Sequence, residues 1–283
     1  MANQRHKYEY KVTPNAAGTK ITRMVGTNKR VLELGSGPGS ITRLLKEQQC
    51  RVTALELDSK AIELVAEFCE RVFPCDLNDP EWPAILSGLD KFEVIVAGDV
   101  LEHLYDPWTT LTNLQPLLAD DGYVVISLPH AGHNAVVACL MTGDFEYQPW
   151  GLLDQTHIRF FGIKNIQRLF NNAGFKIVEA DFVVKAPEQT EFANRWRRLP
   201  SNTRQALATN KYGSIYQVVI KAVRLSAPGK SLHLESLQIP EPTADAFSSG
   251  AKGSRVLGFI LSYISLKNRK RIAQLLERIG IRL

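Results

Sequence analysis

Short apolar runs alternate along most of the chain with segments in which apolar residues recur at helical spacing. Runs of this length, bounded by turn residues, suit strands of a sheet that is covered on both faces. Seven strands are predicted in this way, near residues 31–34, 51–56, 71–74, 92–97, 123–128, 175–184 and 214–224. Because helices alternate with these strands, the pattern predicts an α/β fold.

The predicted helices are bounded by local signals. Pro107 suits the first turn of one helix, and Ala173-Gly174 suits the end of another. The sequence Asp120-Asp-Gly122 predicts a turn into the fifth strand. Helices are therefore expected over residues 40–48, 59–70, 106–118, 135–141 and 163–172, with a helical excursion over 187–210.

The most informative stretch runs from Arg30 to Ser40 and places three glycines, Gly35, Gly37 and Gly39, directly after the first apolar run. Glycines allow a sharp turn without Cβ atoms where a ligand approaches the backbone. The helix that follows directs its free N–H groups toward that turn. Dinucleotide enzymes use a similar turn and some glycine turns bind nothing, so this feature alone does not identify a ligand.

Acidic residues after the next strands narrow the choice. Glu56 lies 21 residues after Gly35, near the spacing at which a carboxylate accepts hydrogen bonds from ribose hydroxyls. Asp76 follows the third strand and could accept from an adenine amino group. Asp99 follows the fourth strand, at the edge where parallel strands leave room for a ligand. The pattern favours a nucleoside site.

Four segments, Glu33–Gly39, Glu56–Asp58, Cys75–Leu77 and Asp99–Leu104, resemble successive motifs of class I S-adenosylmethionine-dependent methyltransferases. Leu101-Glu-His and the later His157–Phe161 resemble the branch of ubiquinone-pathway O-methyltransferases and bacterial sugar and cell-surface glycan methyltransferases. The resemblance covers residues 8 to 185. It implies a seven-stranded, doubly wound Rossmann-like sheet, mostly parallel, whose last strand is antiparallel beside the sixth.

The resemblance also implies a cofactor, S-adenosyl-L-methionine, and a site for each of its parts. The methionine part is assigned to Glu33, Gly35, Ser36, Gly37 and Gly39. The ribose is assigned to Glu56, the adenine to Leu57, Asp76 and Leu77, and the sulfonium end to Gly98 and Asp99. The third glycine comes one position earlier than in G-x-G-x-x-G, which favours this cofactor over NAD.

Methyl transfer to a hydroxyl needs alignment, exclusion of water and a base. The candidate bases are His157, His130 and His103, with Asp99 as a base or an orienting group. A histidine with a pKa near neutrality suits a sugar or phenol hydroxyl. For each histidine, a structural role is the alternative, and no metal cluster is expected because the nearest acids serve the cofactor.

An insertion of about residues 130–160 follows the fifth strand and is expected on the acceptor side of the sheet. Tyr147 and Trp150, together with Phe145, could stack on an acceptor ring or hold the insertion down. Arg159 could reach the acceptor beside His157. Tyr8 belongs to an N-terminal segment that in related enzymes covers the site, and an ordinary surface tyrosine is the alternative.

Composition adds limits rather than a function. The 283 residues suffice for one α/β domain with about a hundred residues left for additions. Four scattered cysteines without a C-x-x-C pair favour free thiols over a disulfide frame or a zinc site. The hydrophilic start of the chain does not resemble a signal peptide. We expect a cytoplasmic protein.

Charge is concentrated at the end of the chain. Residues 251–283 carry net +7, which leaves −2 for residues 1–250 of the total +5. The eight cations are Lys252, Arg255, Lys267, Arg269, Lys270, Arg271, Arg278 and Arg282. We expect the methyltransferase domain over 1–225, a Pro/Ser-rich linker over 226–254 and a basic amphipathic helical tail over 255–283.

The tail has two interpretations. A short apolar segment beside cations suits a helix lying on anionic lipid at the inner face of the membrane. Docking on its own domain, a partner protein or a second subunit is the favoured alternative. No nucleic acid is expected, because no stacking platform accompanies the charge.

We expect an S-adenosylmethionine-dependent methyltransferase that O-methylates a small-molecule or glycan acceptor, above all a hydroxyl of a saccharide or cell-surface glycan precursor. A quinone or phenol O-methyltransferase of a biosynthetic pathway is the alternative enzyme. A noncatalytic module that keeps the cofactor fold and recruits a partner through its tail is the alternative of another class.

Overall fold

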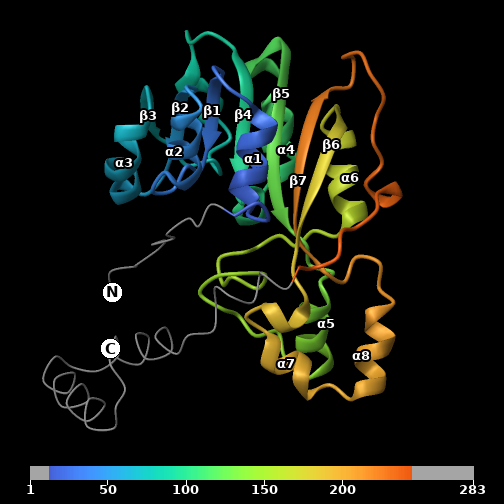
Figure 1. Ribbon diagram of the computed structural model, residues 1–283. Coiled ribbons are helices and arrows are strands. Elements are labelled where there is room, and N and C mark those ends of the chain that lie inside the picture. The colour runs from blue at the N-terminus through green and yellow to red at the C-terminus, as the bar shows by residue number, and fades with distance from the viewer. Residues whose placement is uncertain (1–12, 244–283) are drawn as a thin grey trace, which may run out of the picture. The chain divides into compact units, whose positions relative to one another are not determined.

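The computed structural model describes residues 13–243 (Figure 1). Its seven strands form one sheet in the order β3-β2-β1-β4-β5-β7-β6. The strands are β1 (Arg30–Leu34), β2 (Arg51–Glu56), β3 (Arg71–Pro74), β4 (Phe92–Gly98), β5 (Leu118–Pro129), β6 (Phe175–Val184) and β7 (Ile215–Arg224). Only β7 runs antiparallel to its neighbours, β5 and β6. The predicted fold and the antiparallel last strand are confirmed.

Helices cover both faces of this sheet. On one face lie α1 (Ala17–Val25) and α2 (Ser40–Glu47), which pack on the side chains of alternate strand residues such as Val31 and Val96. On the other face lie α4 (Pro107–Asn113) and α6 (Ile163–Asn172), which pack on Leu32 and Ile95. Figure 1 shows α1 in front of the strands and α4 and α6 behind them. This double cover explains why the strands read as continuous apolar runs.

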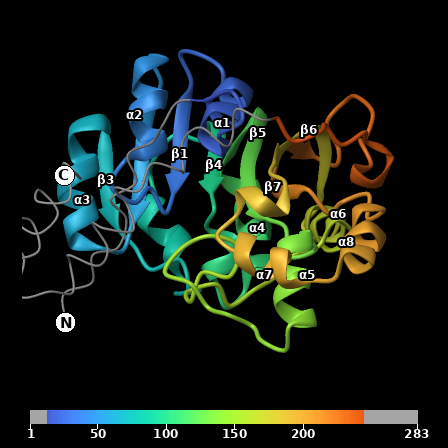
Figure 2. The ribbon, with the colours of Figure 1, turned by 60° about the horizontal axis from the view of Figure 1, so that its bottom comes forward.

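A third group of helices lies beyond the carboxyl ends of the parallel strands, at the bottom of Figure 1. It comprises α5 (Asn134–Met141), α7 (Ala193–Arg198) and α8 (Ser201–Ala208), with Trp196, Leu199 and Ala138 buried between them. Figure 2 brings this end forward and shows the loop that follows α5 beside α7. The helical excursion expected over 187–210 is therefore present and covers the edge of the sheet where ligands bind.

Two predicted helices end early. The first, α3, covers Ser59–Val65 instead of residues 59–70, because the chain tightens into a 3₁₀ turn over Ala66–Phe68 and Cys69 is extended. The second, α4, ends at Asn113 instead of Leu118 because Pro116 lacks the N–H that an α-helix needs. A 3₁₀ turn over Gln115–Leu117 replaces its last turn.

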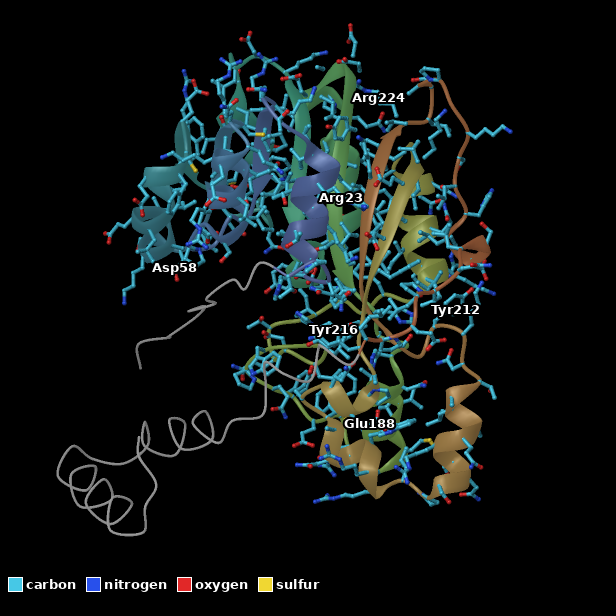
Figure 3. The ribbon with its side chains drawn as sticks, in the orientation of Figure 1. Arg23, Asp58, Glu188, Tyr212, Tyr216 and Arg224 are labelled. Atoms are coloured by element: carbon cyan, nitrogen blue, oxygen red, sulfur yellow. The ribbon has the colours of Figure 1, made fainter. Side chains whose placement is uncertain are left out.

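The fifth strand begins earlier than predicted and contains an irregularity. Its pairing with β4 shifts between Phe92 and Val94, so the segment around Gly122 is a bulge within the strand rather than a turn before it. The Arg224 guanidinium, which Figure 3 labels at the far end of β7, donates hydrogen bonds to the carbonyl oxygens of Gln115, Leu118, Ala119 and Asp120. One side chain thus holds the irregular entry into β5.

Part of the stretch expected as a linker packs on the domain. Leu234 is fully buried in the core cluster that includes α6, and Leu232 and Leu237 pack against that cluster. The Leu232 N–H donates to the Ile177 carbonyl of β6 at 2.7 Å. These contacts differ from the expectation of a linker without a core, and residues up to Glu241 belong to one compact unit.

The expectations for Tyr8 and for the tail over 255–283 lie outside the described residues. Among residues 13–243, the structure contains no helix that is long and apolar enough to cross a membrane.

Candidate functional site

The glycine turn after β1 needs the backbone freedom that its composition predicts. Gly35, Gly37 and Gly39 all have positive φ, at 57°, 54° and 89°. A Cβ at Gly35 would lie 2.9 Å from the Val100 side chain, and one at Gly39 would lie 2.9 Å from Phe68. At Gly37, by contrast, a Cβ would meet nothing within 4 Å. The middle of the turn therefore borders open space that a ligand can occupy.

Glu33 lies beneath this turn. Its side chain is 2% exposed, and one carboxyl oxygen accepts a 2.7 Å hydrogen bond from the Thr42 hydroxyl of α2. Burial raises the pKa of Glu33 to about 8. The carboxyl is therefore protonated at neutral pH and links β1 to α2.

Glu56 connects the turn to the end of β2. Its carboxylate accepts the Gly37 N–H at 2.7 Å and the N–H groups of Leu57 and Asp58 at 2.9 Å each. Leu57 is 65% exposed, although a leucine ordinarily avoids water. The structure thus brings Gly37, Glu56 and the apolar Leu57 together at one edge, and their assignment to the cofactor stays a prediction.

Asp76 and Leu77 follow β3 at the same edge. Asp76 is exposed and accepts the Asn78 N–H at 2.9 Å, and Asn78 in turn accepts the Tyr105 N–H at 2.8 Å. Leu77 packs against the core cluster on the α4 side. Because Asp76 belongs to a short loop held by Asn78, its carboxylate has a fixed place next to β2.

Asp99 is held from two neighbouring strands. Its carboxylate accepts the Ser127 hydroxyl of β5 at 2.6 Å and the Gln217 amide of β7 at 2.5 Å. It follows Gly98, and its own φ is 55°, a conformation that only some non-glycine residues adopt. Burial raises the pKa of Asp99, although the hydrogen bond from Ser127 opposes this. Sequence reasoning found Asp99 but missed Ser127 and Gln217.

His157 lies in a buried cluster with Glu102 and His103. Its Nε2 atom is 3.9 Å from Oε1 of Glu102, and its ring centroid is 4.8 Å from that of His103. Glu102 is fully buried, and neither of its carboxyl oxygens has a hydrogen-bond partner among the described residues. His103 Nδ1 lies 3.1 Å from both the carbonyl and the hydroxyl oxygen of Thr156.

Burial sets the protonation of this cluster. It lowers the pKa of His157 to about 4 and raises the pKa of Glu102 well above its ordinary value, with the nearby Asp99 carboxylate adding to the second shift. The His157 imidazole is therefore neutral at pH 7, and burial favours the uncharged form of the Glu102 carboxyl. A neutral imidazole can accept a proton, and the Glu102 carboxyl lies beside the imidazolium that would form.

The same three side chains are also the group that could hold a cation. The ligand atoms of Glu102, His103 and His157 all lie within 4.8 Å of one another. The sequence predicted no metal cluster, because the nearest acids were assigned to the cofactor, whereas this group has the residue types of a cation site. The burial of Glu102 could not be foreseen from its motif, since it depends on residues 154–158 folding back over the end of β4.

His130 occupies a different environment. It is 3% exposed, and its ring lies 6.4 Å from that of Tyr212. A Cβ at Gly132 would lie 2.7 Å from its ring, so the imidazole is tightly enclosed. Burial lowers the pKa of His130 to about 4. Within residues 13–243, no hydrogen bond or ring contact joins it to Asp99 or His157, so it does not share their cluster.

Lys185 is a half-buried cation that the sequence did not single out. It follows β6 at the same edge, with Nζ 3.4 Å from the ring centroid of Tyr216, a residue that Figure 3 labels near the junction with α7. Burial lowers the pKa of Lys185, while the carboxylates of Glu191 and Asp99 oppose this shift. The edge thus carries a cation facing the acids. A lysine after an apolar strand carries no distinguishing spacing, so no sequence signal marked it.

The insertion presents aromatic side chains beside His157. Phe145 packs edge-on against Tyr147 at 5.2 Å and against Phe160 at 5.3 Å, and Phe160 also faces His157 at 6.4 Å. Tyr147 is 58% exposed and Trp150 45% exposed. Both sequence alternatives are therefore represented: Phe145 holds the insertion together, while Tyr147 and Trp150 keep exposed ring surface.

Comparison with known proteins gives a consistent result. A family model described as a methyltransferase domain matches residues 5–180. A ubiquinone biosynthesis O-methyltransferase from Aromatoleum aromaticum is 24% identical over 166 residues, which are 56% of this chain and 69% of that protein. A ribosomal RNA small subunit methyltransferase A from Zymomonas mobilis is 29% identical over 133 residues, 46% of this chain but only 38% of that protein.

A solved structure shares the fold. A proposed methyltransferase from Bacillus halodurans C-125 superposes with a TM-score of 0.52 at 15% identity. The match covers 74% of this chain and 99% of that one. The sheet and its helices are therefore common to both proteins, whereas the matched length leaves part of this chain without a counterpart.

Proposed function

The chain belongs to the methyltransferase domain family, and we propose that it O-methylates a hydroxyl of a saccharide or cell-surface glycan precursor. Its cofactor is S-adenosylmethionine. The observation that carries the proposal is the neutral, buried His157 beside Glu102 at the ligand edge of the sheet. A hydroxyl acceptor needs a base within reach of its proton. The pKa of His157, about 4, differs from the near-neutral value expected from the sequence, so the imidazole is unprotonated at neutral pH but is a weaker base.

The residues of the ligand edge fit the cofactor. Open space adjoins Gly37, and the buried Ser36 hydroxyl has no hydrogen-bond partner among the described residues. We assign the ribose hydroxyls to Glu56, the face of the adenine to Leu57 and the adenine amino group to Asp76. Gly98 and Asp99 would lie at the sulfonium end, where the Asp99 carboxylate offers a complementary charge.

S-adenosylmethionine, when bound, supplies a methyl group on a positively charged sulfur for in-line displacement. The chain then has three tasks: to orient the acceptor, to exclude water and to remove the hydroxyl proton. Tyr147, Trp150 and Phe160 offer ring faces on which a sugar can stack. His157 would take the proton at a ring nitrogen, and the Glu102 carboxyl, 3.9 Å away, would lie beside the imidazolium that forms.

A quinone or phenol O-methyltransferase is the second candidate. It is favoured by the similarity to the ubiquinone biosynthesis enzyme. Both candidates methylate a hydroxyl and use the same base. They differ only in whether the ring that stacks on Tyr147, Trp150 and Phe160 is a sugar or an aromatic ring. The alternative of another class is a noncatalytic module, which would bind S-adenosylmethionine without methyl transfer. We also propose that the basic tail contacts a membrane or a partner protein.

The test is calorimetric titration of the purified chain with S-adenosylmethionine, S-adenosylhomocysteine and NAD, followed by acceptor assays. We expect saturable binding of the first two and none of NAD. Methyl transfer to nucleotide sugars or lipid-linked glycans, with transfer to catechols or quinols absent, would support the saccharide proposal. The reverse preference would replace it with the quinone alternative, and binding without turnover on either set would favour the module.

A further inference from the structure

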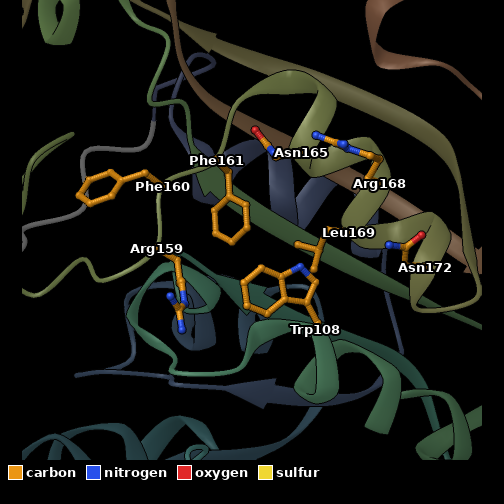
Figure 4. Close-up of a pocket in the computed structure, with 8 residues that line it drawn as sticks. All are labelled: Trp108, Arg159, Phe160, Phe161, Asn165, Arg168, Leu169 and Asn172. Carbon is orange, nitrogen blue, oxygen red and sulfur yellow. The ribbon is translucent and has the colours of Figure 1, made fainter.

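A surface pocket of about 280 Å³ lies between α4, α6 and residues 159–161 (Figure 4). Its polar lining comes from one face of α6, where Asn165, Arg168 and Asn172 recur at helical spacing. Its other walls are aromatic or cationic. The residues concerned are Trp108, Arg159 and Phe160. The volume suits part of a ligand rather than a whole one.

The lining contains two guanidinium groups and no carboxylate. Arg168 is exposed, and within residues 13–243 its side chain has neither a hydrogen bond nor an ion pair. Arg159 donates from Nε and Nη2 to the Tyr105 carbonyl, which leaves its Nη1 N–H groups available. The hydrogen bond from the Thr109 N–H is the main cause that lowers the pKa of nearby Asp106, and the Arg159 charge adds to this shift. The Asp106 carboxylate therefore partly offsets the positive charge of Arg159.

Two exposed rings stand beside these cations. Trp108 is 44% exposed and Phe160 is 39% exposed. The Arg159 Cζ lies 5.4 Å from the Trp108 ring, and this stacking orients its guanidinium plane. Figure 4 shows Arg159 and Arg168 on opposite sides of the pocket, and a single guanidinium group can bind phosphate oxygens in bidentate fashion. The combination of flat apolar surface, amides and two arginines therefore favours a phosphate ester joined to an apolar or planar group.

The pocket shares its wall with the proposed reaction centre. The Glu102 carbonyl accepts the N–H groups of Ile158 and Arg159 at 2.9 and 3.0 Å. Phe160 lines the pocket and also faces the His157 ring at 6.4 Å. Arg159 follows His157 by two residues, so their Cα atoms are at most about 7 Å apart.

We propose that this pocket binds a phosphate ester of the acceptor, so that the methylated saccharide is a phosphorylated one carried on a nucleotide or a lipid diphosphate. The inference rests on the proposed function and deepens it. Arg159 and Arg168 would hold the phosphate oxygens, and Trp108 with Phe160 would cover the adjoining group. The sugar would then extend along residues 157–160 toward His157.

The experiment uses the full chain and three probes, uridine diphosphate, geranyl diphosphate and inorganic pyrophosphate, titrated in the presence of S-adenosylhomocysteine. Arg159→Gln and Arg168→Gln each remove one pocket cation. Lys164→Gln is the matched control, because Lys164 is on the same helix, pairs with Glu235 and has a 73% exposed side chain outside the pocket.

We expect at least one organic diphosphate to bind, with about a tenfold or greater loss of affinity in each arginine variant and little change in Lys164→Gln. Tighter binding of uridine diphosphate would identify a nucleotide carrier, and tighter binding of geranyl diphosphate a lipid carrier. The proposal is overturned if no probe binds at about 1 mM, or if Lys164→Gln loses as much affinity as the arginine variants. If the phosphate proposal fails in this way but the chain still binds S-adenosylhomocysteine, the methyltransferase proposal remains. If the chain does not bind S-adenosylhomocysteine either, both proposals fail.

Discussion

Nε2 of His157 lies 3.9 Å from Oε1 of Glu102, a carboxyl group with no exposed surface. Because burial lowers the pKa of His157 to about 4, its imidazole is neutral throughout the physiological range. The histidine therefore meets the first requirement of a base without a prior deprotonation step. Three predictions concern this pair and the neighbouring cofactor residues, and two concern stability and the tail.

His157→Gln should lower kcat by about 10²- to 10⁴-fold, the usual contribution of a positioned base, with S-adenosylhomocysteine affinity unchanged. Since the active form of His157 is the neutral one, the wild-type rate should stay level as pH falls from 8 to about 5. Initial rates across this range are the measurement. A decline in rate centred near pH 6.5 would show that His157 titrates like an exposed histidine. His233→Gln, which changes an exposed histidine outside the cluster, is the control.

Glu102→Gln should lower kcat about tenfold without unfolding the protein, because burial favours the uncharged form of this carboxyl and an amide has the same shape. The wild-type enzyme treated with a chelator should keep its turnover, since we assign the pair to proton transfer. Rates measured with EDTA, and then with added Mg²⁺, Mn²⁺ or Zn²⁺, check this. Activity that disappears with EDTA and returns with one of these ions would assign Glu102, His103 and His157 to a cation instead.

Glu56→Ala and Asp76→Ala should each weaken cofactor binding by about 1 to 3 kcal/mol through lost hydrogen bonds to the nucleoside. Asp58→Ala is the matched control. Asp58 caps α3 by accepting the Lys60 N–H at 2.9 Å, so its loss should cost about 1 kcal/mol of stability and leave cofactor affinity unchanged. Titration curves that are the same for all three variants would remove the assignment of Glu56 and Asp76 to the cofactor.

Glu33→Gln should make the protein more stable than the wild type at pH 8 and leave the two nearly equal near pH 4.5. Burial raises the folded-state pKa of Glu33 to about 8 from an ordinary value of 4.5. The contribution of this group to the stability of the wild type is therefore fully present below pH 4.5 and is lost as pH rises toward 8. The difference should grow by about 1 kcal/mol per pH unit within that window. Urea unfolding at pH 5, 6.5 and 8 measures it, and parallel pH profiles would contradict it.

Removal of residues 253–283 should leave the unfolding free energy and the cofactor affinity unchanged, because the compact unit extends only to Glu241. The same deletion should reduce binding to vesicles of anionic lipid or to a partner protein, since it removes most of the net +7 charge. Vesicle sedimentation of both forms, beside their melting curves, is the measurement. A truncated chain that unfolds would mean that the tail is part of the core.

The sequence predicted the fold because each strand carries its own signal. The bounds of β6 and α6 were predicted without error, since Gly174 separates them and each has a regular pattern. The errors fell at positions that depend on backbone detail, at Pro116 and at the bulge around Gly122. Periodicity describes which residues face a core, whereas it does not describe where a helix tightens or a strand shifts register.

The unpredicted parts of the site come from neighbours in the sheet rather than in the chain. Gln217 reaches Asp99 because β7 inserts beside β5, and Ser127 reaches it because β5 lies beside β4. Glu102 is covered by a segment more than fifty residues later in the chain. Such contacts depend on strand order and loop return, which spacing along one sequence does not specify.

The position of β7 has a consequence for how the protein is made. Because β7 lies between β5 and β6, the sheet cannot close until residues 215–224 have left the ribosome. Until then, β5 and β6 have unpaired edges of apolar residues, the kind of surface that chaperones bind and that aggregates. A nascent chain that ends before residue 215 therefore has neither a closed sheet nor the Gln217 contact to Asp99, so the enzyme becomes competent only late in its synthesis.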